Sequence, residues 1–249
     1  PTSLTAQQLA SARASREASS ATEPKANATT AVAIRAERPP VIDGKADETL
    51  WASAQVIDAS RVYDPKEDGD PRFRTEARVA YDARNLYVFV RAFDPHPDSI
   101  NALLAGRDSR TESDGIKIIV DGYHDKRTGY EFAVNPAGVK RDIYTFNDGD
   151  EDQSWDAVWD VATTFDSLGW TAEFRIPLSQ IRYPKAERQT WGFLVTRQIA
   201  RHKEAVSWPL YRRSKGGLSS QFGEITGITA LATPRRLEIA PYSVAKTEN

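Results

Sequence analysis

The stretch "WDAVWDVATTFDSLGWTAEFRIP", residues 155–177, contains two alternating segments separated by turn-forming residues at 166–169. A four-residue turn there predicts a β-hairpin. The expected pairs are Phe165 with Trp170, Val161 with Phe174, and Trp159 with Ile176. Alternation then places one set of apolar side chains on a single face, which belongs in a core: Trp159, Val161, Phe165, Trp170, Ala172, Phe174 and Ile176. Glu173 and Arg175 point the other way.

Short alternating segments separated by turns continue along the rest of the chain. "TEARVAYD" and "NLYVFVRAF" flank a turn at 82–85, and "GYEFAVN" and "VKRDIYTF" flank another at 135–138. Such spacing is typical of an all-β sandwich. We predict one sandwich over residues 33–232, with a few short helices around Asp47–Ala54, Ser99–Leu104 and Leu178–Ile181.

The two ends of the chain differ from this pattern. Residues 1–32 are dominated by Ala, Ser and Thr and contain no aromatic residue, which predicts a flexible tail. Residues 233–249 follow the boundary signal Thr233-Pro234 and are expected to start another domain, here truncated.

Composition excludes several functions. The net charge is −2, from 33 basic and 35 acidic residues, so we expect no nucleic-acid partner. The absence of cysteine excludes disulfides, thiolate zinc sites and cysteine nucleophiles. Methionine is also absent, even at position 1, so we expect that an upstream segment such as a signal peptide has been removed. No nucleophile elbow, P-loop or dinucleotide fingerprint occurs.

Trp155 has two interpretations that remain open. It shares the apolar face of the hairpin but lies beyond the paired residues, beside Asp150 and Asp152. An aromatic ring at the end of a sandwich can stack on a pyranose while nearby carboxylates accept hydrogen bonds from its hydroxyls. Alternatively, Trp155 caps the rim of the core. Trp159, four residues further on, is expected to be structural.

Acidic residues in "NDGDED", residues 147–152, suggest a cation site. Asp148, Asp150 and Asp152 alternate as in a calcium loop. The EF-hand pattern then fails, because Gln153 stands where glycine is needed and Trp159 where the bidentate glutamate belongs. A solvated acidic loop is favoured over a calcium site of another type. In "FDPHPDSI", Asp98 is expected to cap a helix that begins at Ser99.

The segment "VIDGKADETLW", residues 41–51, resembles the opening motif of carbohydrate-binding module family 9. Further segments are similar to that family in the same order: "VAYDARNLYVFVRAFDP", "DGIKIIVDGYHDKRTGYEFAVNPAGVKRD", "SWDAVWD", "GWTAEFRIPLSQIRY" and "WGFLVTRQIAR". The full set resembles the subgroup in which this module precedes an outer-membrane β-barrel domain of uncharacterised function. "PRRLEIAPYSV" is similar to the place where that barrel begins.

The resemblance implies a distorted jelly-roll sandwich, a carbohydrate ligand, and export to the periplasm, outer membrane or cell surface. In sugar-binding members two aromatic residues clamp the ligand, which points to Trp155 and to either Tyr123 or Tyr144. It also implies structural calcium. Relatives of the fold bind haem through a methionine and a lysine, so a chain without methionine is not expected to bind haem.

Three functions follow from these expectations. The first is a non-catalytic module that binds a glycan through aromatic stacking and polar loop contacts. The second is a structural periplasmic or plug domain that packs on a barrel and has no working sugar site. The third and least supported is a glycoside hydrolase, which needs two carboxyl groups facing one cleft.

Overall fold

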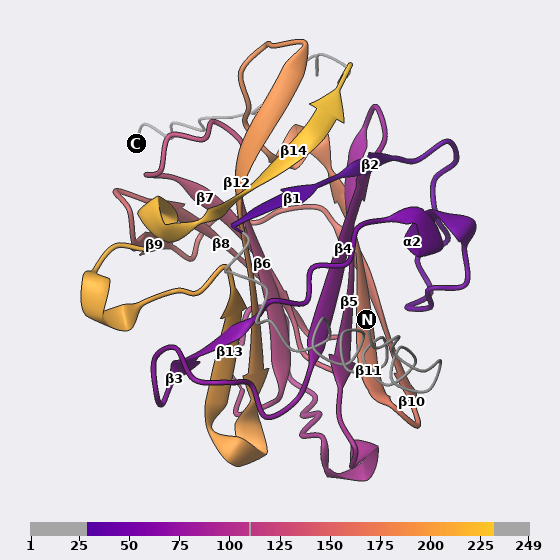
Figure 1. Cartoon of the computed structure of the whole chain (residues 1–249), viewed down its shortest axis with the longest axis vertical. Coiled ribbons are helices and arrows are strands. Elements are labelled where there is room, and N and C mark those ends of the chain that lie inside the picture. The colour runs from indigo at the N-terminus through magenta and orange to yellow at the C-terminus, as the bar shows by residue number, and fades with distance from the viewer. Residues whose placement is uncertain (1–28, 110, 232–249) are drawn as a thin grey trace, which may run out of the picture.

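The chain folds into two β-sheets packed face to face, as a computed structural model describes it for residues 29–109 and 111–231 (Figure 1). Within these residues the larger sheet has nine strands, in the order β1-β14-β12-β6-β7-β8-β9, with β13 paired to β12 and β3 paired to β13. The smaller sheet has five strands, in the order β10-β11-β5-β4-β2. The predicted all-β jelly-roll sandwich is confirmed.

Strands of the larger sheet are β1 (Thr30–Val32), β3 (Arg61–Asp64), β6 (Gly115–Asp121), β7 (Gly129–Val134), β8 (Lys140–Phe146), β9 (Asp150–Asp152), β12 (Arg188–Ile199), β13 (Glu204–Trp208) and β14 (Gly223–Thr229). Those of the smaller sheet are β2 (Ile34–Arg35), β4 (Thr75–Tyr81), β5 (Asn85–Phe93), β10 (Asp160–Asp166) and β11 (Gly169–Pro177). Helical elements are short: α2 (Thr49–Ser53), η1 (Pro97–Ser99), η2 (Leu178–Gln180), η3 (Ala200–His202), η4 (Arg213–Lys215) and η5 (Ser219–Gln221).

The hairpin β10–β11 forms with the predicted register, Phe165 opposite Trp170 and Val161 opposite Phe174. The ladder ends at the pair Asp160–Arg175, so the predicted pairing of Trp159 with Ile176 is wrong. Trp159 nevertheless reaches the core, where its ring stacks on Phe174 at 5.8 Å between centroids. Phe165 was expected in the core and is 46% exposed, because β10 is an edge strand and Phe165 lies beside its turn.

The main core lies between the sheets and is built from the inward-facing side chains of both. Alternation along β6, β7 and β11 supplies every second residue to it, as the pattern of these strands requires. Large members with almost no exposed surface include Trp159, Trp170, Trp191, Phe132, Phe174 and Phe193.

A second buried cluster covers the outer face of the smaller sheet. Trp51 of α2 packs there on Phe89 at 5.6 Å, and Figure 1 shows α2 beside β4, outside the sandwich. Glu173 points away from the main core as predicted, yet it has no exposed surface. Its carboxylate accepts three hydrogen bonds of 3.0 Å, from the Trp51 indole and from the backbone N–H groups of Asp43 and Gly44. Asp43 and Gly44 are therefore architectural.

One expected boundary changes. Residues 1–32 were predicted as a flexible tail, but Thr30–Val32 forms β1 and pairs in parallel with β14. The sandwich thus begins before residue 33. The rest of that tail, residues 1–28, and the segment 233–249 lie outside the described residues.

The helix predicted over Ser99–Leu104 is wrong. A single 3-10 turn, Pro97–Ser99, is followed by extended backbone. The Leu103 N–H donates to the Ser113 hydroxyl, and the Leu103 carbonyl accepts from the Asn135 amide. Side chains therefore supply the hydrogen bonds that a helix would have made within its own backbone. Asp98 lies within this turn, whose N-cap is His96, and Asp94 accepts hydrogen bonds from the His96 backbone and from Arg201.

Removing either large side chain of β11 is expected to destabilise the fold. Trp170→Ala and Phe174→Ala should each lower the free energy of unfolding by roughly 3–5 kcal/mol, because each leaves a cavity in the main core. Phe165→Ala is the matched control on the same hairpin and should cost far less, since its ring is half exposed. Urea unfolding measures all three. Equal losses of unfolding free energy in Phe165→Ala and Trp170→Ala would contradict the assignment of Trp170 to the core and of Phe165 to the exposed edge.

The Glu173 carboxyl should make stability depend on pH. Burial raises the pKa of Glu173 to about 7, from 4.5 in an unperturbed chain, despite the three hydrogen bonds. The folded state then keeps a proton that the unfolded state releases, so this contribution is complete below pH 4.5 and is lost as pH rises towards 7.

The measurement is the difference in unfolding free energy between the parent and Glu173→Ala across this pH range. The parent's advantage should shrink as pH rises. An advantage that is independent of pH would show that Glu173 does not titrate in this window.

Candidate functional site

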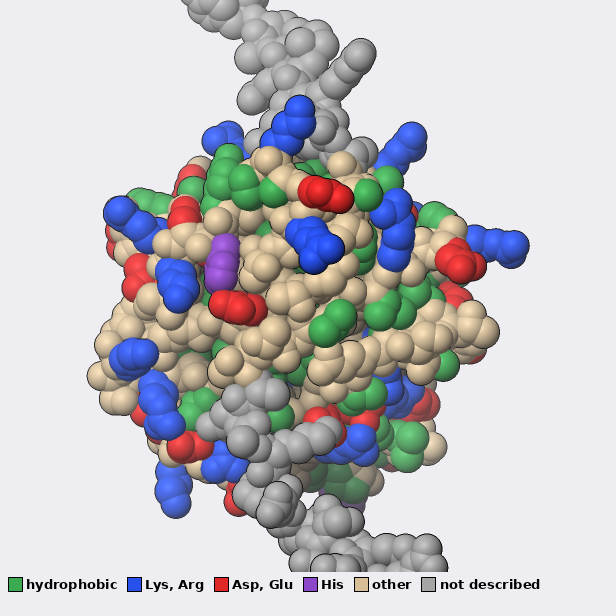
Figure 2. Space-filling model, turned by 45° about the horizontal axis from the view of Figure 1, so that its top comes forward, with side chains coloured by type: hydrophobic (Ala, Val, Ile, Leu, Met, Phe, Trp, Pro, Cys, Tyr) green, Lys and Arg blue, Asp and Glu red, His purple; other side chains and the backbone are tan. Residues whose placement is uncertain are grey.

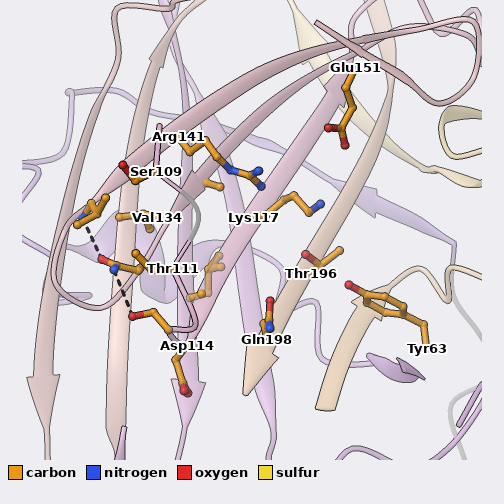
Figure 3. Close-up of a pocket in the computed structure, with 16 residues that line it drawn as sticks. Tyr63, Ser109, Thr111, Asp114, Lys117, Val134, Arg141, Glu151, Thr196 and Gln198 are labelled. Atoms are coloured by element: carbon orange, nitrogen blue, oxygen red, sulfur yellow. Dashed lines mark hydrogen bonds between the residues drawn. The ribbon is translucent and has the colours of Figure 1, made fainter. Parts of the chain in front are cut away.

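A polar groove crosses the outer face of the larger sheet, on the side opposite the main core (Figure 3). It consists of two adjoining cavities, with volumes of about 330 and 350 Å³. They share Tyr63, Lys117, Glu151 and Thr196. The size suits a small chain of sugar residues better than a single ion.

The groove floor carries three charged residues on three adjacent strands. β7 lies between β6 and β8, and its Glu131 accepts ion pairs from Lys117 on β6 (3.2 Å) and Arg141 on β8 (2.8 Å). Glu131 is 1% exposed, and each of its two carboxylate oxygens contacts one of these cations. Burial alone would lower the pKa of Lys117, but the negative charge of Glu131 outweighs this effect and raises the pKa above its usual value.

Aromatic and hydroxyl side chains form the walls. The rings of Tyr63 and Tyr211 meet edge to face at 5.5 Å. Burial raises the pKa of Tyr63, so its hydroxyl stays protonated and can donate a hydrogen bond. Thr196 and Gln198 of β12 line the floor, and Ser109 and Thr111 lie across the groove from Tyr63 (Figure 3). Such a lining can bind a ligand rich in hydroxyl groups.

Trp155 lies on the other side of the sheet from this groove. It is partly buried, and its ring contacts Tyr130 at 5.3 Å and Phe132 at 5.7 Å. Both partners belong to the main core. The structure therefore places Trp155 at the rim of that core with part of its surface exposed, and its role as a sugar platform stays a prediction.

The other expected ligand residues are spread over two regions. Tyr144 is partly buried beside Tyr130, at 5.2 Å, whereas Tyr123 is 49% exposed just after β6. Asp152 is paired with Tyr144 across β8 and β9, so the two side chains lie on the same face of the sheet. Asp150, two residues earlier in β9, lies on that face as well. The groove is on the opposite face. Glu151, which lies between them in β9, faces the groove.

The expected calcium ligands do not converge. Asp148 accepts hydrogen bonds from the backbone N–H groups of Leu218 and Ser220, at 3.0 and 2.7 Å. Asp150 accepts from Asn147, and Asp152 from Ser154. Within residues 29–109 and 111–231 no group of three or more acidic or histidine side chains could hold a metal ion. Each of these carboxylates has another hydrogen-bond partner, and calcium binding by Asp148, Asp150 and Asp152 stays a prediction.

Sequence reasoning missed the groove residues for an identifiable reason. Alternation in "GIKIIV", "GYEFAV" and "VKRDIY" places Lys117, Glu131 and Arg141 opposite the apolar positions. That signal was present, but it does not show that three strands bring these side chains together. Tyr63 and Tyr211 come from segments whose pairing no local pattern indicates.

The fold defines a class of protein, the two-sheet all-β sandwiches, and in this chain a polar groove crosses one of the sheets. The model of the family described as carbohydrate family 9 binding domain-like matches residues 42–206. The chain belongs to this family.

Solved structures have the same fold. A family 9 carbohydrate-binding module from Caldicellulosiruptor kristjanssonii in complex with glucose has a TM-score of 0.59 at 19% identity, covering 83% of this chain and 100% of that one. The complex with cellotriose gives 0.59 at 18%, covering 85% and 100%. A putative carbohydrate-binding protein from Bacteroides uniformis gives 0.60 at 15%, covering 79% and 98%.

No curated protein sequence matches the chain. In the part of the chain that the structure describes, no helix has the length and apolar character needed to cross a membrane.

Proposed function

We propose that the domain is a non-catalytic module that binds a glycan in the groove of the larger sheet. The observation that carries this proposal is the convergence of hydrogen-bonding side chains in one concave place, beside the two rings of Tyr63 and Tyr211. Family membership supports it, as do the glucose and cellotriose bound by structural neighbours.

The groove lining matches the chemistry of a sugar. Hydroxyl groups both donate and accept, and the groove offers cationic donors, neutral hydroxyls, the Gln198 amide and the Glu151 carboxylate. The Tyr63–Tyr211 pair supplies apolar ring surface next to these groups, on which the C–H face of a sugar ring can rest.

The acidic residues of the groove favour binding over hydrolysis. Asp114, Asp148 and Glu151 line it in the described part of the chain. Asp114 is fully buried, and Asp148 is engaged by the backbone of residues 218–220. Glu151 is exposed, and glycoside hydrolysis requires a second carboxyl group across the scissile bond.

A second candidate site comprises Trp155 with Tyr144 or Tyr123, and with Asp150 and Asp152. It is supported by the partial exposure of Trp155 and by Tyr144 and Asp152 lying on one face. One experiment separates the two sites, since they lie on opposite sides of the larger sheet.

The test is a glycan array, with and without calcium, followed by calorimetric titration of the best ligand. Tyr211→Ala should weaken binding by at least about tenfold, roughly 1.4 kcal/mol, with little loss of stability. Trp155→Ala should leave affinity unchanged. Phe165→Ala, an exposed ring on the smaller sheet, is the control.

Loss of affinity at Trp155 but not at Tyr211 would move the site to the core rim. If no glycan binds, the second function remains, a structural domain packing on a partner.

We further propose that the protein is exported and works in the periplasm, outer membrane or cell surface, beside a C-terminal barrel domain. The resemblance of residues 234–244 to the start of such a barrel supports this, and the lack of cysteine is compatible with it. In fractionated cells the full-length protein should appear with the envelope. Recovery only in the cytosol would contradict the proposal.

A further inference from the structure

The groove floor holds more positive than negative charge at its centre. Lys117 and Arg141 share the single carboxylate of Glu131, one cation on each oxygen. Glu131 lies beneath them with 1% of its surface exposed, so it neutralises one of the two charges and cannot itself reach a ligand. Figure 3 shows both cationic head groups in the middle of the groove.

Most donors of these two residues remain available. An ammonium group carries three N–H donors and a guanidinium five, and each contacts one oxygen of Glu131 through a single nitrogen, which leaves further N–H groups of that nitrogen and of the guanidinium for a ligand. Both side chains are partly buried in the groove floor. Partial burial makes their attraction for a ligand anion stronger than that of a cation in open water.

The other carboxyl groups of the groove are exposed to water or engaged by backbone N–H groups. Glu151 faces the groove and is exposed, so water screens its charge. Asp148 is already bound by two backbone N–H groups, and Asp114 is fully buried and accepts the backbone N–H of Ala200. The Tyr63 hydroxyl is neutral. Elsewhere the visible surface mixes both signs of charge without one dominant patch (Figure 2).

We propose that the groove selects a glycan that carries an anionic group, a uronic-acid carboxylate or a sulfate, and that this group docks on Arg141 and Lys117. A planar guanidinium matches such oxygens with two parallel hydrogen bonds, and Lys117 adds a point charge. Thr196, Gln198 and the Tyr63–Tyr211 pair hold the rest of the sugar. This inference rests on the proposed glycan-binding function.

The test compares oligosaccharides in matched sets of three, which share a backbone and differ only in carrying a hydroxymethyl, a carboxylate or a sulfate group. Glucan, galactan and mannan sets cover the common backbones. In any set that binds, one acidic member should bind at least about tenfold tighter than the neutral one, at about 50 mM salt. Which acidic member binds tighter identifies the group.

Variants assign the preference to residues. Arg141→Gln should remove most of the acidic preference, measured as the ratio of acidic to neutral affinity, and Arg141→Lys should keep part of it. Arg175→Gln is the control, because Arg175 pairs with Asp160 on the smaller sheet, away from the groove. Should Arg141→Gln fail to fold, the salt dependence of the parent decides, since only the acidic ligands should lose affinity as salt rises.

The outcomes separate this inference from the proposed function. Neutral members that bind as tightly as acidic ones would overturn the anionic preference and leave glycan binding intact. An acidic preference that persists in Arg141→Gln would overturn the assignment to this pair. If no member of any set binds, both proposals fail.

Discussion

Strand β11 is buried on both faces, and both layers of the molecule depend on it. Trp170 and Phe174 enter the core between the sheets, while Glu173 on the opposite face binds the segment that leads into α2. β11 pairs with β5 over nine residues and with β10 over seven, which fixes the order of the smaller sheet. A buried carboxylate with three donors is satisfied only if Asp43, Gly44 and Trp51 all take their places.

The larger sheet differs from β11, because only one of its faces packs against the core. Its other face must satisfy charged side chains at partly buried positions, and the Lys117–Glu131–Arg141 cluster does so across three strands. Unpaired, Glu131 would carry a large desolvation cost. Two cations on one carboxylate stabilise it and leave positive charge facing the groove. A requirement of the fold therefore also supplies the chemistry of the candidate site.

Aromatic residues connect the β8–β9 edge of the larger sheet to the core. Tyr144, Tyr130, Trp155, Phe132 and Trp159 form a continuous series of ring contacts that runs from the sheet edge into the core. Trp155 is a member of this series, so part of its ring surface is in contact with the core. Its neighbours Asp150 and Asp152 face the same side, so the polar groove receives Glu151 from the same short strand.

The sequence by itself determined the all-β class, the register of the β10–β11 hairpin and the burial of Trp170 and Phe174. These follow from alternation and turn chemistry, which act between neighbours in the chain. Only the tertiary structure decided that Glu173 is covered, that Phe165 is exposed at an edge, and that Lys117, Glu131 and Arg141 meet Tyr63 in one groove. Those outcomes depend on which strands lie side by side and on what covers each face, and such long-range pairing leaves no mark in local periodicity.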